Sequence, residues 1–162
     1  MSYLKRALLI CWIVVVSVGC STNSEEEDIS FDSDGQITHT DSNGKIIDED
    51  KNDWRIQKYF QGDVFIDQKP FPNPTANGIV LLTLRYSTVV PEGGVYFMAN
   101  SVSGLPVQLK ADLSPSFGSR AYDLNLTLLA SSFSNLKGKQ FRIRIYDGPG
   151  RLISYGDVEV SN

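Results

Sequence analysis

Few side chains in this sequence are suited to acid, base or nucleophilic chemistry. The chain of 162 residues has one histidine, His39, and two cysteines, Cys11 and Cys20. Imidazole transfers protons near neutral pH, and thiolates serve as nucleophiles and zinc ligands. Ser-His-Asp and Cys-His arrangements and typical structural zinc sites therefore lack the residues that they need. The sequence also has no Walker loop and no dinucleotide-binding glycine motif.

A pair of carboxylates is the remaining catalytic option, because two acids suffice for glycoside hydrolysis. From Trp54 onward the acids are Asp63, Asp67, Glu92, Asp112, Asp123, Asp147, Asp157 and Glu159. Most of them fall at predicted turns or at outward positions of predicted strands, where carboxylates are usually solvated. We therefore expect a protein that is not an enzyme and needs no cofactor.

Basic side chains indicate a binding surface instead. Arg142 and Arg144 alternate with apolar residues in one predicted strand, so both point away from the core. Arg85 and Lys110 are expected to point outward on neighbouring segments. Together the four could bind an anionic glycan, a lipid headgroup or an acidic loop of a partner protein. The alternative is scattered charge that keeps the outer face of a sheet soluble.

Aromatic side chains offer a second way to bind a ligand. Exposed tyrosines could stack on sugar rings, and the candidates are Tyr59, Tyr86, Tyr146 and Tyr155. The alternative is that these tyrosines are buried in the core, which is the commoner place for them.

Charge is unevenly distributed along the chain. The net charge is -4, but residues 20–53 contain 11 acidic and 2 basic residues, whereas residues 54–162 contain 8 acidic and 11 basic ones. The acidic balance of the whole chain gives no reason to expect a nucleic-acid partner. The part after residue 53 is mildly basic, which suits an anionic partner.

The N-terminus has the three zones of a secretory signal. Lys5 and Arg6 precede an apolar run from Ala7 to Val18, and small residues stand before Cys20. The run is shorter than the roughly 20 residues that cross a bilayer as a helix. Residues 1–19 are therefore predicted to be a cleaved signal peptide.

The residues Ser17, Val18, Gly19 and Cys20 resemble the lipobox of bacterial lipoproteins. The resemblance implies that Cys20 is diacylated and becomes the new N-terminus, although the lipobox usually has leucine where Ser17 stands. Acyl chains would then anchor the protein to a membrane. The alternative is an ordinary signal peptide that leaves Cys20 as a free thiol.

A short polar spacer and a run of acids follow Cys20. Ser24, Glu25, Glu26, Glu27 and Asp28 resemble the surface-export signal of Bacteroidota lipoproteins. The resemblance implies an outer-membrane lipoprotein that faces the cell surface. The alternative is a solvated acidic tether without a sorting role.

Residues 20–53 are predicted to form a flexible tether, because their polar composition cannot bury enough surface to order them. Within them Asp32-Ser33-Asp34-Gly35 is echoed by Asp41-Ser42-Asn43-Gly44, and both favour tight hairpin turns. Alternating acids from Asp32 to Asp50 could also bind calcium. An EF-hand calcium loop begins with aspartate and ends with glutamate. Here such a loop would begin at Ser30 or His39 and end on an aspartate, which argues against calcium binding.

Residues 54–162 are predicted to form one all-β domain. Short runs alternate between apolar and polar residues with a period of two, as in strands with one buried face. The expected strands cover residues 55–60, 64–66, 79–82, 95–99, 107–112, 122–128, 140–146, 152–155 and 158–160. The only helical candidate is one turn within residues 130–136. Seven to nine short strands predict a single antiparallel sandwich of immunoglobulin-like type, without the disulfide of antibody domains.

Two segments resemble the sandwich-type sorting domains of type IX secretion. They are residues 69–78, with Pro72-Asn73-Pro74, and residues 145–151, with Asp147-Gly148-Pro149-Gly150. The resemblance supports the fold, but the chain ends without the glycine-aromatic strand and basic terminus of that family. We therefore expect no sorting role.

The sequence as a whole predicts a non-enzymatic outer-membrane lipoprotein. Its expected role is an accessory or docking subunit of a larger envelope complex, such as a barrel, a transporter or secretion machinery. The alternative is a free-standing surface module that binds a glycan or acts as an adhesin.

Overall fold

The computed structural model describes residues 36–162. The predicted signal peptide, Cys20, the acids from Glu25 to Asp28 and the repeat at Asp32 lie outside the described residues. The described part is all-β with antiparallel sheets, which confirms the predicted fold class. Its elements are β1 (His39–Thr40), β2 (Ile46–Asp48), β3 (Arg55–Ile56), η1 (Lys58–Phe60), β4 (Val64–Phe71), β5 (Ile79–Tyr86), β6 (Val95–Asn100), β7 (Pro106–Asp112), β8 (Gly118–Asn125), η2 (Leu126–Leu129), η3 (Phe133–Asn135), β9 (Gln140–Asp147) and β10 (Leu152–Glu159).

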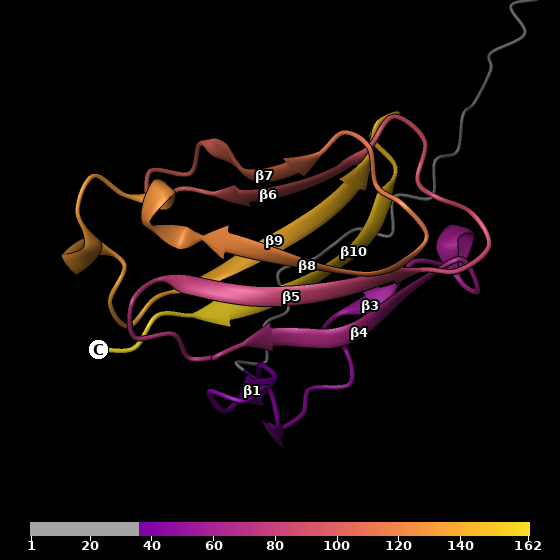
Figure 1. Ribbon diagram of the computed structural model, residues 1–162. Coiled ribbons are helices and arrows are strands. Elements are labelled where there is room, and N and C mark those ends of the chain that lie inside the picture. Colours follow the sequence, from indigo (N-terminus) through magenta and orange to yellow (C-terminus); the bar gives the residue numbers. More distant parts are fainter. Residues whose placement is uncertain (1–35) are drawn as a thin grey trace, which may run out of the picture. The chain divides into compact units, whose positions relative to one another are not determined.

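Two sheets form the body of the fold. One has five strands in the order β3-β10-β9-β6-β7, and the other has three in the order β4-β5-β8. In Figure 1 the smaller sheet lies in front of the larger one. The chain crosses between the sheets after β3, β5, β7 and β8, as it does in antiparallel sandwiches. The more specific immunoglobulin-like arrangement stays a prediction.

The core follows from the alternation in the strands. In β9 the side chains of Phe141, Ile143 and Ile145 are buried, and in β5 every second residue from Val80 to Tyr86 is buried. Because successive side chains of a strand point to opposite faces, these residues meet between the two sheets. The remaining residues of β9 and β5 are directed outward, where a binding surface can form.

Two predicted segments differ in local conformation, and a third prediction, of one helical turn, is confirmed. The strand expected over residues 122–128 ends at Asn125, whose side chain accepts a hydrogen bond from the Thr127 N–H and so begins η2. The alternation ends there, and Leu128 is consequently 53% exposed instead of buried. The segment 55–60 holds a two-residue strand followed by η1, and the helical turn expected within 130–136 is the 3-10 turn η3.

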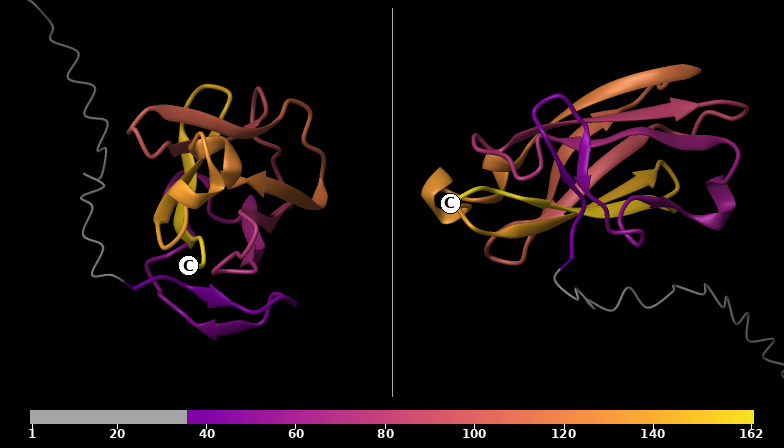
Figure 2. Two further views of the ribbon diagram at one scale, coloured as in Figure 1. Left: turned by 90° about the vertical axis from the view of Figure 1, so that its left-hand side faces the viewer. Right: turned by 90° about the horizontal axis from the view of Figure 1, so that it is seen from below.

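The folded unit begins earlier than the sequence predicts. Residues 36–53 were expected in the flexible tether, yet β1 and β2 pair as a hairpin, and Ile37, Thr38 and Asp53 are buried. Figure 2 shows this hairpin against one side of the sandwich. Asp41 stabilises its turn, because the carboxylate accepts hydrogen bonds from Asn43 N and Lys45 N, and these bonds lower the pKa of Asp41. Composition did not reveal this order, because few residues of the segment are apolar.

Asn73 holds this N-terminal segment in place. Its amide nitrogen donates to the carbonyl oxygens of Thr38 and Asp157, at 2.7 and 3.2 Å, and its side-chain oxygen accepts from Glu159 N at 2.9 Å. The backbones of Asn73 and Thr40 also exchange hydrogen bonds of 2.8 and 3.2 Å. One fully buried amide thus joins the N-terminal segment, the β4–β5 loop and β10.

We expect Asn73→Ala to lower the free energy of unfolding by about 3 kcal/mol, because it leaves buried donors and acceptors without partners. Asn73→Asp should be at least as harmful, since a carboxylate would face two carbonyl oxygens. Asn100→Ala, at an exposed position of β6, is the control and should stay within about 0.5 kcal/mol. Urea unfolding measures all three, and an Asn73→Ala protein as stable as the control would contradict the role of the amide.

Candidate functional site

The outward face of the five-stranded sheet gathers arginines around one tyrosine. In the register of the strands, Tyr155 of β10 pairs directly with Arg55 of β3 on one side and with Arg144 of β9 on the other. Directly paired side chains of neighbouring strands lie about 5 Å apart at their Cβ atoms. The guanidinium of Arg142 lies 5.2 Å from the centre of the Tyr155 ring. We call these four residues the arginine face.

Within the arginine face, Arg142 is held by an internal ion pair. Its Nε and Nη2 atoms donate to the two carboxylate oxygens of Asp157, at 2.9 and 2.6 Å. Both side chains are nearly buried, with 9% and 11% exposure. The bidentate pair raises the pKa of Arg142 and fixes its position. Arg142 therefore positions Tyr155 and brings little net charge to the surface.

Arg144 and Arg55 carry the free positive charge of the face. Within residues 36–162 no carboxylate lies within ion-pair distance of either guanidinium. Arg144 is half-buried beside Tyr155, and Arg55 is exposed at the edge of the sheet. The sequence predicted Arg144 from its alternation. The sequence predicted a strand from residue 55 but did not indicate Arg55 as a binding residue, because its place beside Tyr155 depends on the pairing of β3 with β10.

The four predicted binding residues do not share one surface. Arg85 lies on β5 of the three-stranded sheet, so its outward side chain faces away from the arginine face. It pairs with Asp67 at 2.8 Å and lies 4.2 Å from the centre of the Phe65 ring. Lys110 is exposed on the edge strand β7 of the larger sheet. Alternation shows which side chains point outward, but it does not show which sheet a strand joins.

The tyrosine candidates also separate. Tyr86 is buried, and its hydroxyl lies 2.8 Å from that of Tyr122, which donates to Asp112 at 3.0 Å. Burial raises the pKa of Tyr122 to about 12 and that of Tyr86 further, so both hydroxyls stay protonated. Tyr86 is thus a core residue and cannot meet a sugar.

Tyr146 and Tyr155 lie on the outward side of the five-stranded sheet. Tyr146 pairs with Leu152 of β10 and Tyr96 of β6, which places a second aromatic group next to the arginine face. All of these side chains are half-buried. The face therefore combines positive charge with flat apolar surface.

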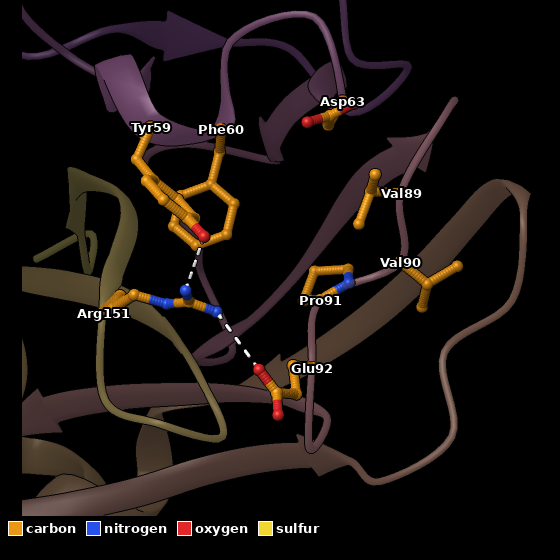
Figure 3. Close-up of a pocket in the computed structure, with 8 residues that line it drawn as sticks. All are labelled: Tyr59, Phe60, Asp63, Val89, Val90, Pro91, Glu92 and Arg151. Atoms are coloured by element: carbon orange, nitrogen blue, oxygen red, sulfur yellow. Dashed lines mark hydrogen bonds and ion pairs between the residues drawn. The ribbon is translucent and has the colours of Figure 1, made fainter.

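Tyr59 lies elsewhere, beside a hollow of about 400 Å³ at the end of the sandwich away from the C-terminus (Figures 1 and 3). The hollow lies between η1, the β5–β6 loop and the β9–β10 turn. Its lining residues are Tyr59, Phe60, Asp63, Val89, Val90, Pro91, Glu92 and Arg151. Sequence reasoning did not predict it, because three segments distant in sequence form it.

Arg151 is the central polar group beside this hollow. Its Nε and Nη2 lie 2.6 Å from a carboxylate oxygen of the buried Asp147, and its Nη1 donates to the Tyr59 hydroxyl at 2.6 Å. The guanidinium also lies 4.5 Å from the centre of the Tyr59 ring. The contact with Asp147 raises the pKa of Arg151.

Asp53 is the one described carboxyl group whose pKa rises strongly. Burial raises it to about 6, even though the carboxylate accepts hydrogen bonds from Thr38 N at 3.0 Å and Asp157 N at 2.8 Å. These bonds connect the N-terminal segment to the strand that carries Tyr155. Asp53 therefore makes the attachment of the N-terminal segment sensitive to pH.

Within residues 36–162, no group of three or more histidine, cysteine or acidic side chains is placed to bind a metal ion. His39 lies 3.7 Å from the Glu159 carboxylate. In the same part of the chain, no helix has the length and apolar character needed to cross a bilayer.

Comparisons with protein-family models, curated proteins and solved structures found no match to this chain. Its function is therefore inferred from the sequence and from the geometry of the arginine face.

The pKa of Asp53 predicts a pH-dependent stability. The folded state keeps the Asp53 proton up to about pH 6, whereas the unfolded chain loses it near 3.8. Because the folded state binds more protons in this window, this group makes the free energy of unfolding fall as pH rises from about 4 to about 6.

Urea unfolding between about pH 4.5 and pH 7.5 tests this dependence. We expect the decrease in the native protein and in Asp123→Asn, a substitution at an exposed position of β8. Asp53→Asn should lack it, whatever its absolute stability. An unchanged pH slope in Asp53→Asn would assign the proton to another group.

Proposed function

We propose that this chain is a non-enzymatic lipoprotein of the outer membrane that serves as a docking subunit of a larger envelope complex. The lipobox-like residues before Cys20 support the lipid anchor, and the acids from Glu25 to Asp28 support a position on the cell surface. The arginine face is the proposed docking surface for an acidic region of the partner. No transmembrane segment is required for this role, because acyl chains hold the protein at the membrane.

The observation that carries the docking role is the pair of uncompensated arginines on either side of Tyr155. Arg55 and Arg144 occupy fixed positions on the two strands that flank β10, and Arg142, paired with Asp157, lies over the Tyr155 ring. Arginine and tyrosine are among the residues that contribute most often to binding energy at protein interfaces. A rigid sheet also loses little conformational entropy when it binds.

Charge defines the class of partner. The arginine face has an excess of positive charge, so it complements a surface rich in aspartate and glutamate. Such attraction speeds association and weakens as salt screens it. The acidic partner would belong to an envelope assembly that the lipid anchor lets the domain reach.

A glycan is the second candidate ligand, and the outward tyrosines favour it. Tyr96 and Tyr146 adjoin the arginine face and could stack on sugar rings while an arginine binds a carboxylate or sulfate group. Purification in mild detergent separates the two functions. A stoichiometric membrane protein supports docking, whereas retention of a glycan without such a protein supports the surface module.

Reversing the charge of the face should abolish docking. We expect the double substitution of Arg55 and Arg144 by glutamate to reduce recovery of the partner at least about tenfold, with each change costing about 0.5 kcal/mol of stability or less. Lys137→Glu with Lys139→Glu makes the same change in net charge at exposed positions outside the sheet and should leave recovery intact.

Quantitative pull-down from detergent extracts measures this effect. Equal recovery by the arginine double variant, or binding that does not weaken between about 0.05 and 0.5 M salt, would place the docking surface elsewhere.

The lipid anchor is tested at the cysteines. Cys20→Ser should lose metabolic labelling by palmitate, because serine has no thiol to which the diacylglycerol can attach. Cys11→Ser, within the expected signal peptide, is the matched control and should keep both the label and the membrane association. A Cys20→Ser protein that still carries the acyl label would overturn the proposed anchor.

A further inference from the structure

The hollow at the η1 end of the sandwich has the walls of a binding pocket for an apolar stem. Phe60 and Pro91 are buried at its base, and Val89 and Val90 form one side (Figure 3). Its volume of about 400 Å³ falls in the range of pockets that bind small groups. Neither Arg55, Arg144 nor Tyr155 lines it, so it is separate from the arginine face.

The charges around the hollow favour a cation. Arg151 lies next to the buried Asp147 carboxylate, and these two charges compensate each other. Of the two other acids at the hollow, Glu92 forms an ion pair with Arg151, and Figure 3 shows Asp63 on a different side of the hollow. Glu92 is 78% exposed and lies 3.8 Å from Arg151, which is too far for a hydrogen bond. The Asp63 carboxylate takes part in none of the side-chain hydrogen bonds and ion pairs within residues 36–162, so it is able to receive a ligand donor.

The rim indicates that the ligand belongs to a protein. Large apolar side chains are exposed on the loops at this end, with exposures of 68% for Tyr59, 56% for Val89, 69% for Leu113 and 64% for Phe117. The loop that starts at Leu113 packs against the β5–β6 loop at Gly94. Exposed apolar side chains that extend beyond a pocket are typical of protein-binding surfaces.

We propose that the hollow binds a lysine side chain of a partner protein. The aliphatic stem of the lysine would pack against Phe60 and Pro91, and its ammonium group would donate hydrogen bonds to the Asp63 carboxylate. A lysine side chain has a long apolar stem and three donors on a compact head, which fits apolar walls that end in a carboxylate. The exposed apolar rim would cover the residues on either side of that lysine. This inference is independent of the docking role proposed for the arginine face.

Titration of the full-length chain in detergent micelles, followed by amide NMR shifts, tests the proposal. The probe is a capped pentapeptide with leucines on both sides of a central lysine. The control peptide has norleucine in place of the central lysine, which keeps an unbranched apolar side chain and removes the positive charge. We expect the lysine peptide to shift the amide signals of Gly62, Gly93 and Gly150, which adjoin the hollow, and the norleucine peptide to bind at least about tenfold more weakly.

Two variants of the protein test which carboxylate binds the lysine peptide. Asp63→Asn should weaken binding of the lysine peptide at least about tenfold, whereas Asp123→Asn, on the exposed side of β8, should not. Equal binding of the lysine and norleucine peptides, or no shifts at about 20 mM peptide, would overturn the proposal. Tighter binding of spermidine than of the lysine peptide would also overturn it, because the site would then be one for a free polyamine.

Discussion

The requirement that buried polar groups find partners determines how the first described residues are placed. The Asn73 amide and the Asp53 carboxylate satisfy backbone groups of the N-terminal segment and of β10 at the same time. Because both groups bind the backbone of Asp157, they also fix the residue that pairs with Arg142. Arg142 in turn lies over Tyr155, so the geometry of the arginine face depends on contacts made on the other side of β10.

Much of the fold could be predicted from the sequence, because period-two alternation is a local property of each strand. The alternation of Phe141, Ile143 and Ile145 predicted β9 and the outward position of Arg144. The order of residues 36–53 could not be predicted, since it depends on Asn73, which the sequence presents only as a turn residue between two prolines. Contacts between distant segments, and not composition, keep this segment folded.

Which residues together form the candidate site was harder to predict than which of them point outward. Alternation separated inward from outward side chains, but membership of a sheet depends on pairing between distant strands. Alternation alone therefore groups Arg85 with residues that lie on the opposite sheet, and it does not indicate Arg55, which pairs with Tyr155 of β10. The sequence also predicts that Arg142 offers its charge to a ligand, whereas in the fold Asp157 neutralises that charge. Alternation does not show this pairing, because Asp157 is 15 residues away in the sequence.

The hairpin at the start of the described chain has a mechanical consequence. Residues 36–53 precede every strand of the two sheets, so tension applied from the N-terminal side reaches their hydrogen bonds to Asn73 and β10 first. These bonds are few compared with those that join β9 and β10. Under load the hairpin would detach while both sheets remain folded, and the freed residues would extend the reach of the domain by roughly 60 Å.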